Sequence, residues 1–250
     1  MLLIRVVSVL LFLMATIALT TVAMAETPVM VNTGVDLVNR YIWRGLDIAS
    51  TPSIQPSLSL TVANLEVGTW GAYTLSNNAS GSDEIDFWVS YSLELERGAS
   101  IVPIVTDYYF PNAGIDFFNF NNYDATIDDT IPDPGAHTVE LGVAVTGPET
   151  FPLTVSAFVN VHNDAGNNTY FQADYTLTVQ STDLNFFCGA SLGSDENPGY
   201  YGTDAFAVIN LGVTASRTIG DPDGLAVPLS VSFILNPKAE ISYLVVGASF

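Results

Sequence analysis

The clearest pattern in this chain is an alternation of apolar and polar residues over segments of about ten residues. In the segment 84–95, every second residue from Ile85 onward is apolar or aromatic, and most of the residues between them are acidic or carry a hydroxyl group. Successive side chains of a β-strand point to opposite faces, whereas a helix would scatter these residues around its axis. The pattern therefore predicts a strand with one apolar and one polar face.

The same alternation recurs along the rest of the chain, and in each case the second face is small or polar. Short connections such as 63–64 and 181–183 alternate with long ones, notably 111–136 and 193–204, as in bacterial outer-membrane barrels. An even number of strands would place both ends of the chain in the periplasm. The connection 218–228 is long for a periplasmic turn and is where a further strand could be hidden. We predict twelve strands, within a range of 10 to 14, at 30–43, 53–63, 65–75, 84–96, 100–110, 137–146, 153–162, 169–180, 184–192, 205–217, 229–236 and 239–250.

A soluble periplasmic β-sandwich also alternates, so alternation alone does not separate the two folds. Aromatic residues near the predicted strand ends favour a barrel, because outer-membrane barrels carry aromatic girdles at both interfaces. We therefore predict an all-β, transmembrane, antiparallel up-and-down barrel. The residues expected in the outer girdle are Tyr41, Trp43, Tyr73, Tyr108, Phe110 and Phe171.

The first 25 residues have the pattern of a cleaved signal peptide. Arg5 precedes an apolar run from Val6 to Leu19, and Ala23-Met24-Ala25 supplies the small-x-small cleavage pattern. A retained signal anchor is the alternative, but the apolar run is short and a cleavage site follows at once. We predict a signal peptide at 1–25 and a barrel domain at 26–250, which contains no other apolar stretch of about 20 residues.

Composition excludes several classes of protein. The net charge of −20, with 26 acidic and six basic residues, argues against nucleic-acid binding. The 14 Phe and 11 Tyr argue against disorder. The single cysteine, Cys188, rules out an internal disulfide. The residues at alternate positions around Cys188 are apolar, so we expect it to face lipid as a small apolar residue.

Short motifs resemble known outer-membrane proteins. Phe250, preceded by apolar residues at alternate positions, resembles the C-terminal strand signal that the barrel-assembly machinery recognises. The stretch Leu37–Leu46, followed by 67–71, 84–87 and 107–111, resembles the TorF-like porin family, in which an aromatic-x-Arg-Gly strand, a Gly-Thr-Trp strand and an acidic-aromatic strand recur in this order. The resemblance covers about the first 90 residues of the mature chain, and the rest only through barrel patterning. It implies a porin-like barrel and no particular solute.

If the apolar faces meet lipid, the charged residues opposite them line the lumen. An excess of acids over arginines at the outer half would favour cations. Alternatively, Arg40 and Arg44 cross-link the acids and close the barrel. Twelve strands about 4.8 Å apart and tilted by about 40° give a radius of roughly 12 Å, which side chains could largely fill. The candidates are Asp36, Arg40, Arg44, Glu66, Glu84, Asp86, Glu94, Asp107, Glu140 and Asp174, of which all but Asp36, Glu66 and Glu94 are placed in the outer half.

Other chemistry has weaker support in the sequence. The loop 111–136 contains Asp116, Asp124, Asp128, Asp129 and Asp133, but its spacing matches no EF-hand, so we predict no metal site. Its Phe117-Phe118-Asn119-Phe120 stretch would either narrow the mouth or bind a partner. An outer-membrane lipid hydrolase needs a serine beside a histidine, and neither His137 nor His162 has a serine two residues away. We predict no enzyme activity and no cofactor.

Together these features predict a bacterial outer-membrane protein that forms a narrow, porin-like diffusion channel for small cationic or neutral solutes. The alternatives are a closed structural or adhesive barrel and, with less support, a lipid hydrolase. The expected partners are outer-membrane lipid and, through the C-terminal strand, the barrel-assembly machinery. The solute and the oligomeric state are left open.

Overall fold

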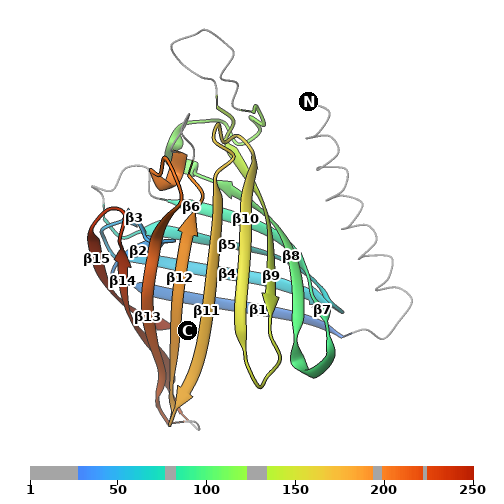
Figure 1. Cartoon of the computed structure of the whole chain (residues 1–250), viewed down its shortest axis with the longest axis vertical. Helices are drawn as coiled ribbons and strands as arrows, with labels where there is room; N and C mark the ends of the chain where they lie inside the picture. The colour runs from blue at the N-terminus through green and yellow to red at the C-terminus, as the bar shows by residue number, and fades with distance from the viewer. Residues whose placement is uncertain (1–27, 77–82, 123–133, 194–198, 222–223) are drawn as a thin grey trace.

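The computed structural model describes residues 28–76, 83–122, 134–193, 199–221 and 224–250. The predicted signal peptide lies outside these residues. Almost every described element is a β-strand, and each pairs antiparallel with its neighbours (Figure 1). The strands are β1 (Val29–Val38), β2 (Tyr41–Trp43), β3 (Leu46–Ala49), β4 (Ser53–Val62), β5 (Leu65–Thr74), β6 (Glu84–Tyr91), β7 (Leu93–Glu94), β8 (Ser100–Tyr109), β9 (His137–Thr146), β10 (Leu153–His162), β11 (Thr169–Val179), β12 (Thr182–Ser191), β13 (Ala207–Gly220), β14 (Ala226–Asn236) and β15 (Ile241–Ser249).

The sheet closes on itself as a barrel. Because β6 and β7 both pair with β8, they form one interrupted strand, and twelve strands of the described chain make up the wall. All are neighbours in sequence order except at the seam, where β1 meets β15. The predicted fold, an antiparallel barrel of about twelve strands, is confirmed.

At the seam, β1 and β15 pair over a shorter length than any other two complete neighbouring strands of the wall. Only the three Cα pairs from Asp36–Ser249 to Val38–Gly247 join β1 to β15, whereas β1 and β4 share ten pairs. Phe250 extends the seam, since its backbone N–H and C=O both bond Val35 at 3.0 Å. At the other side, the Asn39 side chain bonds the backbone of Leu244 and Val246.

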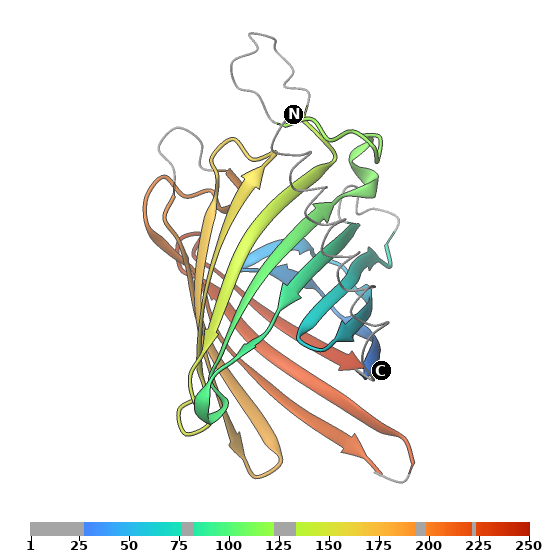
Figure 2. The same ribbon diagram turned by 90° about the vertical axis from the view of Figure 1, so that its right-hand side faces the viewer.

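The two ends of the barrel differ in their connections. We call "loop end" the end with the long connections 110–136 and 192–206, and "turn end" the end with the tight turns, where β1 begins and β15 finishes. Figure 2 shows the β11–β12 and β13–β14 hairpins both projecting at the turn end. The long connection predicted at 218–228 is shorter than expected, because β13 continues to Gly220 and β14 begins at Ala226, so no strand is hidden there.

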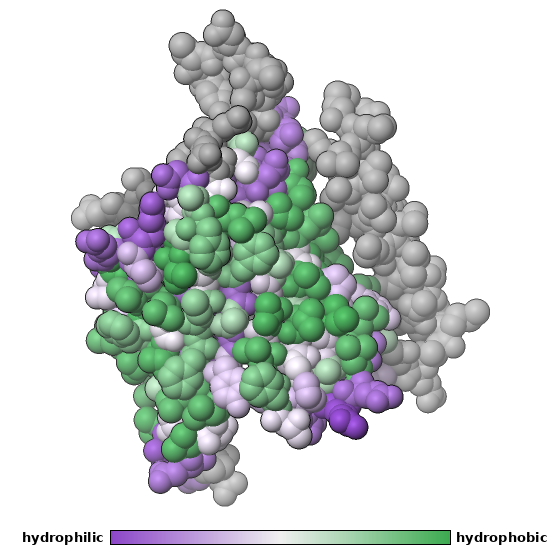
Figure 3. All heavy atoms as spheres, viewed as in Figure 1, coloured by the Kyte–Doolittle hydropathy of each residue, from purple (hydrophilic) through white to green (hydrophobic). Residues whose placement is uncertain are grey.

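The outer surface of the wall is apolar. Figure 3 shows apolar residues over the middle of one side of the molecule and hydrophilic residues towards both ends. Many large apolar side chains are exposed on strands, among them Phe233 at 51% and Leu244 at 59%. Cys188 is exposed as well. In the described chain, no helix has the length and hydropathy needed to cross a membrane.

The prediction of one continuous strand at 30–43 is wrong. The segment 30–43 does not run on as a single strand, because β1 ends at Val38 and the chain bends at Asn39 and Arg40. The strands β2 and β3 then form a separate two-stranded hairpin that is not part of the wall. It lies in the interior of the barrel, as its contacts below establish.

Candidate functional site: an internal hairpin in the lumen

The β2–β3 hairpin turns on two residues with left-handed backbone. Arg44 has φ 49° and Gly45 has φ 81°, and a two-residue turn of type I′ requires a positive φ at both positions. Glycine adopts this conformation freely, whereas arginine does so at a cost. A Cβ atom on Gly45 would lie 1.9 Å from the carbonyl oxygen of Ile209 on β13. The turn therefore packs tightly against β13, and Asn236 on the neighbouring β14 donates to the Gly45 carbonyl at 3.1 Å.

Arg44 fastens the turn to the wall. Its two terminal nitrogens donate to the two carboxylate oxygens of Glu140 on β9 at 2.6 and 2.9 Å, in a bidentate ion pair. The same guanidinium donates to the Tyr201 hydroxyl at 2.8 Å, and Tyr108 donates to Glu140 at 2.9 Å. The side chains of Arg44 and Glu140 are only 11% and 3% exposed, so the pair is shielded from water.

Burial and pairing act together on the ionisable groups at the tip of the hairpin. Burial lowers the pKa of Arg44, but the hydrogen bonds to Glu140 and the electrostatic interactions with Tyr201, Glu140 and Tyr108 together outweigh burial, and the net pKa lies above the ordinary value. Burial raises the pKa of the Tyr201 hydroxyl, while Arg44 partly opposes this. Arg44 is thus a permanent cation and Tyr201 a neutral hydroxyl.

Aromatic rings surround the hairpin. Trp43 stacks on Tyr201 and meets Tyr108 edge-on, both at 5.8 Å between ring centroids. The Arg44 guanidinium lies 4.3 to 4.5 Å from the ring centroids of Trp43, Phe158 and Tyr170. On the other side, Tyr41 packs against Trp70 and donates from its hydroxyl to Glu84 at 2.9 Å. The hairpin thus touches walls on opposite sides of the lumen.

Two cavities flank the hairpin. The cavity on the turn side has about 370 Å³ and includes Arg44, Ser156, Gln172 and Asp174 in its lining. The cavity on the loop side has about 300 Å³ and includes Glu84, Tyr108, Thr138 and Phe110. Trp43 lines both cavities.

The lumen on the turn side of the hairpin is lined mainly by short polar side chains. Hydroxyl pairs bond across neighbouring strands, Thr146 with Thr154 at 3.0 Å and Thr214 with Ser232 at 2.8 Å. Aromatic rings in the lumen lie against glycines of the next strand: Cβ atoms on Gly68, Gly142 and Gly212 would lie within 2.4 Å of ring atoms of Trp88, Phe158 and Phe187. This arrangement flattens the rings against the wall, as aromatic rescue of strand glycines does.

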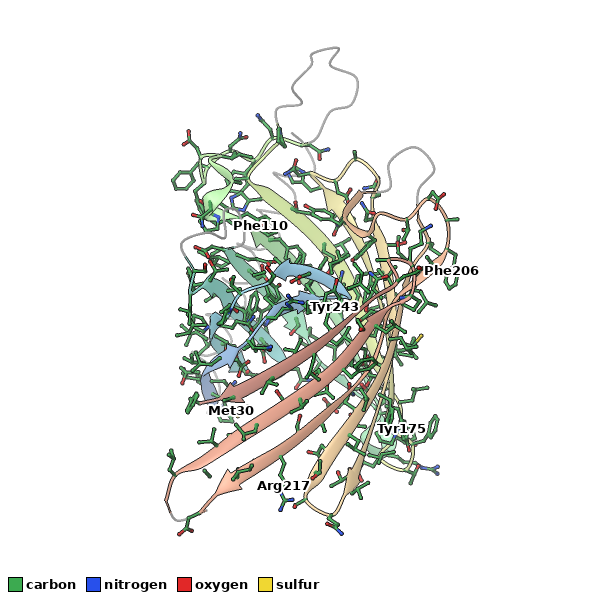
Figure 4. The ribbon with its side chains drawn as sticks, turned by 90° about the vertical axis from the view of Figure 1, so that its left-hand side faces the viewer. Met30, Phe110, Tyr175, Phe206, Arg217 and Tyr243 are labelled. Atoms are coloured by element: carbon green, nitrogen blue, oxygen red, sulfur yellow. The ribbon has the colours of Figure 1, made fainter. Side chains whose placement is uncertain are left out.

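The structure brings several predicted lumen residues together. Arg44 binds Glu140, as in the cross-linked alternative, and Glu84 binds Tyr41 of the hairpin. Arg40 lies 3.8 Å from Asp47 and 5.6 Å from the Tyr243 ring centroid. Figure 4 labels Tyr243 on β15 beside the hairpin. Both arginines belong to the bend and the hairpin, so their assignment to the first strand of the wall is corrected.

Asp86 lies on β6 opposite Trp70, and its side chain interacts with that of Glu84. Three other candidates are dispersed. Asp36 lies on β1 opposite Gln55. Glu66 accepts a hydrogen bond from Trp88 at 2.9 Å, and exposed Glu94 accepts one from Ser92.

Asp107 and Asp174 need correction. Tyr108 faces the lumen, so Asp107 next to it faces outward, where it bonds His137. Asp174 lines the cavity on the turn side of the hairpin, and is therefore not in the outer half.

The predicted girdle is also partly corrected. Tyr41, Trp43 and Tyr108 lie in the interior, and Phe110 lines the loop-side cavity. Tyr73 and Phe171 are exposed at 38% and 37%. An internal hairpin needs aromatic bulk to fill the lumen, which the sequence pattern does not distinguish from a girdle.

Three functional residues were missed in the sequence. Tyr201, Asn236 and Gly45 hold the hairpin in place but show no periodic signal. A weak signal for the hairpin itself exists: Gly45 lies between two short segments rich in strand-forming residues, 41–43 and 46–48.

The described part of the loop 111–136 folds onto the rim. Phe117 and Phe120 pack against His137 with ring centroids 4.9 and 4.4 Å apart, and Phe118 is 84% exposed. The candidate cation ligands Asp124, Asp128, Asp129 and Asp133 lie outside the described residues. Within the described residues, no group of three or more His, Cys, Asp or Glu side chains could hold a metal ion.

Comparison with known proteins places the chain in a family. The model of Gcw_chp, described as a bacterial protein of unknown function, matches residues 22–233. The chain belongs to the Gcw_chp family. The matched region contains Arg44, Glu140 and Tyr201, so the fastened hairpin lies within what the Gcw_chp model covers. No curated protein matches the chain.

Proposed function

We propose that this Gcw_chp protein is an outer-membrane diffusion channel for small cationic or neutral solutes, held closed by its internal hairpin. The observation that carries the proposal is that Trp43 lines both lumen cavities, beside the turn of a hairpin that one buried ion pair attaches to the wall. Removing the hairpin would join the two cavities along a polar lumen.

The outer-membrane location rests on the surface of the barrel. Large exposed side chains such as Leu244 and Phe233 would be costly in water but favourable in lipid. The resemblance to the TorF-like porin family and the predicted signal peptide support the same location. In this setting the loop end faces the outside of the cell and the turn end faces the periplasm.

The cation preference rests on the charges that the hairpin leaves unbalanced. Glu140 is paired with Arg44, whereas Glu84 accepts a hydrogen bond from Tyr41 and interacts with the neighbouring acid Asp86, which has one buried carboxylate oxygen without a described partner. These two acids of β6 would attract cations in a narrow lumen where salt screens charges poorly.

A closed structural barrel is the second candidate. The buried Arg44–Glu140 pair favours this candidate. A bidentate ion pair whose neighbouring polar groups are hydrogen-bonded makes its surroundings rigid. Catalysis is not part of the proposal. Both ring nitrogens of His137 are engaged, by Asp107 and by the Phe117 carbonyl, so this ring is not placed to activate a serine.

The test is single-channel current in planar bilayers with the refolded protein. We expect brief, rare openings for the wild type and a raised open probability for Glu140→Gln, which weakens the hold on Arg44. Glu94→Gln is the matched control, since Glu94 is exposed and far from the hairpin. The absence of any current in all three proteins would refute the channel and favour the structural barrel.

Selectivity is measured in the same bilayers under a salt gradient. The double variant Glu84→Gln, Asp86→Asn should move the reversal potential towards zero. Anion selectivity of the wild type would contradict the cation preference.

A further inference from the structure

The turn-side cavity has the size and chemistry of a binding site for a small ligand. Its volume of about 370 Å³ lies at the lower end of the range for ligand sites. Five strands of the wall, β10 to β14, and the hairpin contribute to it. Polar and aromatic groups face each other across it.

Several donors of the cavity are already used within the protein, whereas one buried acceptor is left over. The Asn210 side-chain nitrogen donates to Tyr170 at 2.9 Å and to Gln172 at 3.2 Å, while its oxygen is buried and has no described partner. Asn210 is only 7% exposed. A buried acceptor without a donor costs free energy, which a ligand hydroxyl would recover.

Asp174 and Ser156 also line the cavity and provide further acceptors of hydrogen bonds. Gln172 donates to both oxygens of the Asp174 carboxylate at 2.9 and 3.0 Å, which leaves further lone pairs of the carboxylate available. Among the described residues that line the cavity, the one cation is Arg44, and it is already paired with Glu140. The cavity therefore lacks a free positive charge for an anionic ligand.

An aromatic face completes the site. Phe187 lies flat over Gly212, whose Cβ would be 2.4 Å from the ring, so one face of the ring is covered by the wall and the ring lines the cavity. A flat apolar ring beside amide, hydroxyl and carboxylate groups suits a ligand with apolar C–H faces and hydroxyl edges.

We propose that this cavity binds a small polyhydroxylated solute of the monosaccharide class, stacked on Phe187 and bonded to Asn210 and Asp174. The inference names the solute of the proposed channel and rests on that function for its physiological meaning. Binding itself is an equilibrium property, and it is measured without conduction.

The test is isothermal titration calorimetry of the full barrel with D-glucose, D-galactose and D-xylose. The barrel is refolded in lauryldimethylamine oxide, because detergents with sugar head groups would compete. We expect saturable binding of at least one sugar with a Kd near 1 mM, that is, about −4 kcal/mol. Phe187→Leu should weaken this binding at least fivefold, and Asn210→Leu should also weaken it.

Phe186→Leu is the matched control, since Phe186 is the neighbouring residue on the outer face, 46% exposed, and should leave the affinity unchanged. A gel shift on boiling verifies that each variant is folded. No saturable heat with any of the sugars at 100 mM, equal affinity in Phe187→Leu, or tighter binding of ethanolamine than of every sugar would overturn the inference. If sugars bind but no current is seen, the binding site stands and the channel fails.

Discussion

The two halves of the lumen are built differently. Towards the loop end, the interior is filled by the hairpin, with its buried ion pair and the stacked rings of Trp43 and Tyr201. Towards the turn end, the same strands present hydroxyl pairs such as Thr146–Thr154 and rings flattened over glycines. The wall is continuous through both halves, so the difference between them comes from what is inserted towards the loop end, the hairpin together with Tyr201. This division makes the two halves separately testable.

The largest expected effect is a weaker attachment of the hairpin to the barrel wall, in the half of the lumen towards the loop end. Glu140→Gln removes one member of a buried ion pair, and such a change costs about 3–5 kcal/mol. The hairpin should then leave its site a hundredfold more often or more. Trypsin cleavage after Arg44 in the folded barrel measures this, and Glu94→Gln is the control. Unchanged protection of Arg44 would show that the ion pair does not fasten the hairpin.

The next largest effect is a difference in stability between substitutions on the two faces of the wall, in the half towards the turn end. Ser90 faces the polar lumen and Val89 the opposite, apolar surface, so Val89→Arg should destabilise the barrel by about 2–4 kcal/mol more than Ser90→Arg. Urea titration in lipid vesicles, followed by the gel shift, gives both values. Equal losses, or a larger loss for Ser90→Arg, would show that the turn half of the lumen is not accessible to water.

The smallest effect concerns the seam, which both halves share. Deleting Phe250 removes its two backbone hydrogen bonds to Val35, a loss of about 1–3 kcal/mol. The fraction of assembled barrel in cells should fall, as membrane fractionation would measure. Phe250→Leu keeps the backbone bonds, and a comparable fall in that variant would assign the effect to recognition of the side chain by the assembly machinery. Full assembly of the deletion would refute both roles.

Most of the wall could be predicted from the sequence, because an apolar outer surface on one side and a polar lumen on the other impose a period of two. The segment 137–146, for example, coincides with β9. The hairpin could not be predicted in this way. Tyr41 and Trp43 keep the strand period across the bend at Asn39, and the bend is stabilised by bonds to Leu244 and Val246, which are distant in sequence.

The site was only partly predictable for a related reason. The pairing of Arg44 with an acid follows from charge and a shared lumen, but the choice of Glu140 depends on how far the hairpin reaches across the barrel. Asp107 was assigned to the wrong face because Asp107 and Tyr108 could each face the lumen, and only the contact between Tyr108 and Trp43 decides between them.

The central claim, that the hairpin alone closes the lumen, has a direct test. Val38 and Ser53 are Cα partners, so residues 39–52 can be replaced by Asn-Gly, which joins β1 to β4 by a tight turn. The measurement is single-channel conductance of this variant beside the wild type, after the gel shift shows that both are folded. We predict long-lived open channels in the variant and rare, brief openings in the wild type. A folded variant with no more current than the wild type would contradict the account.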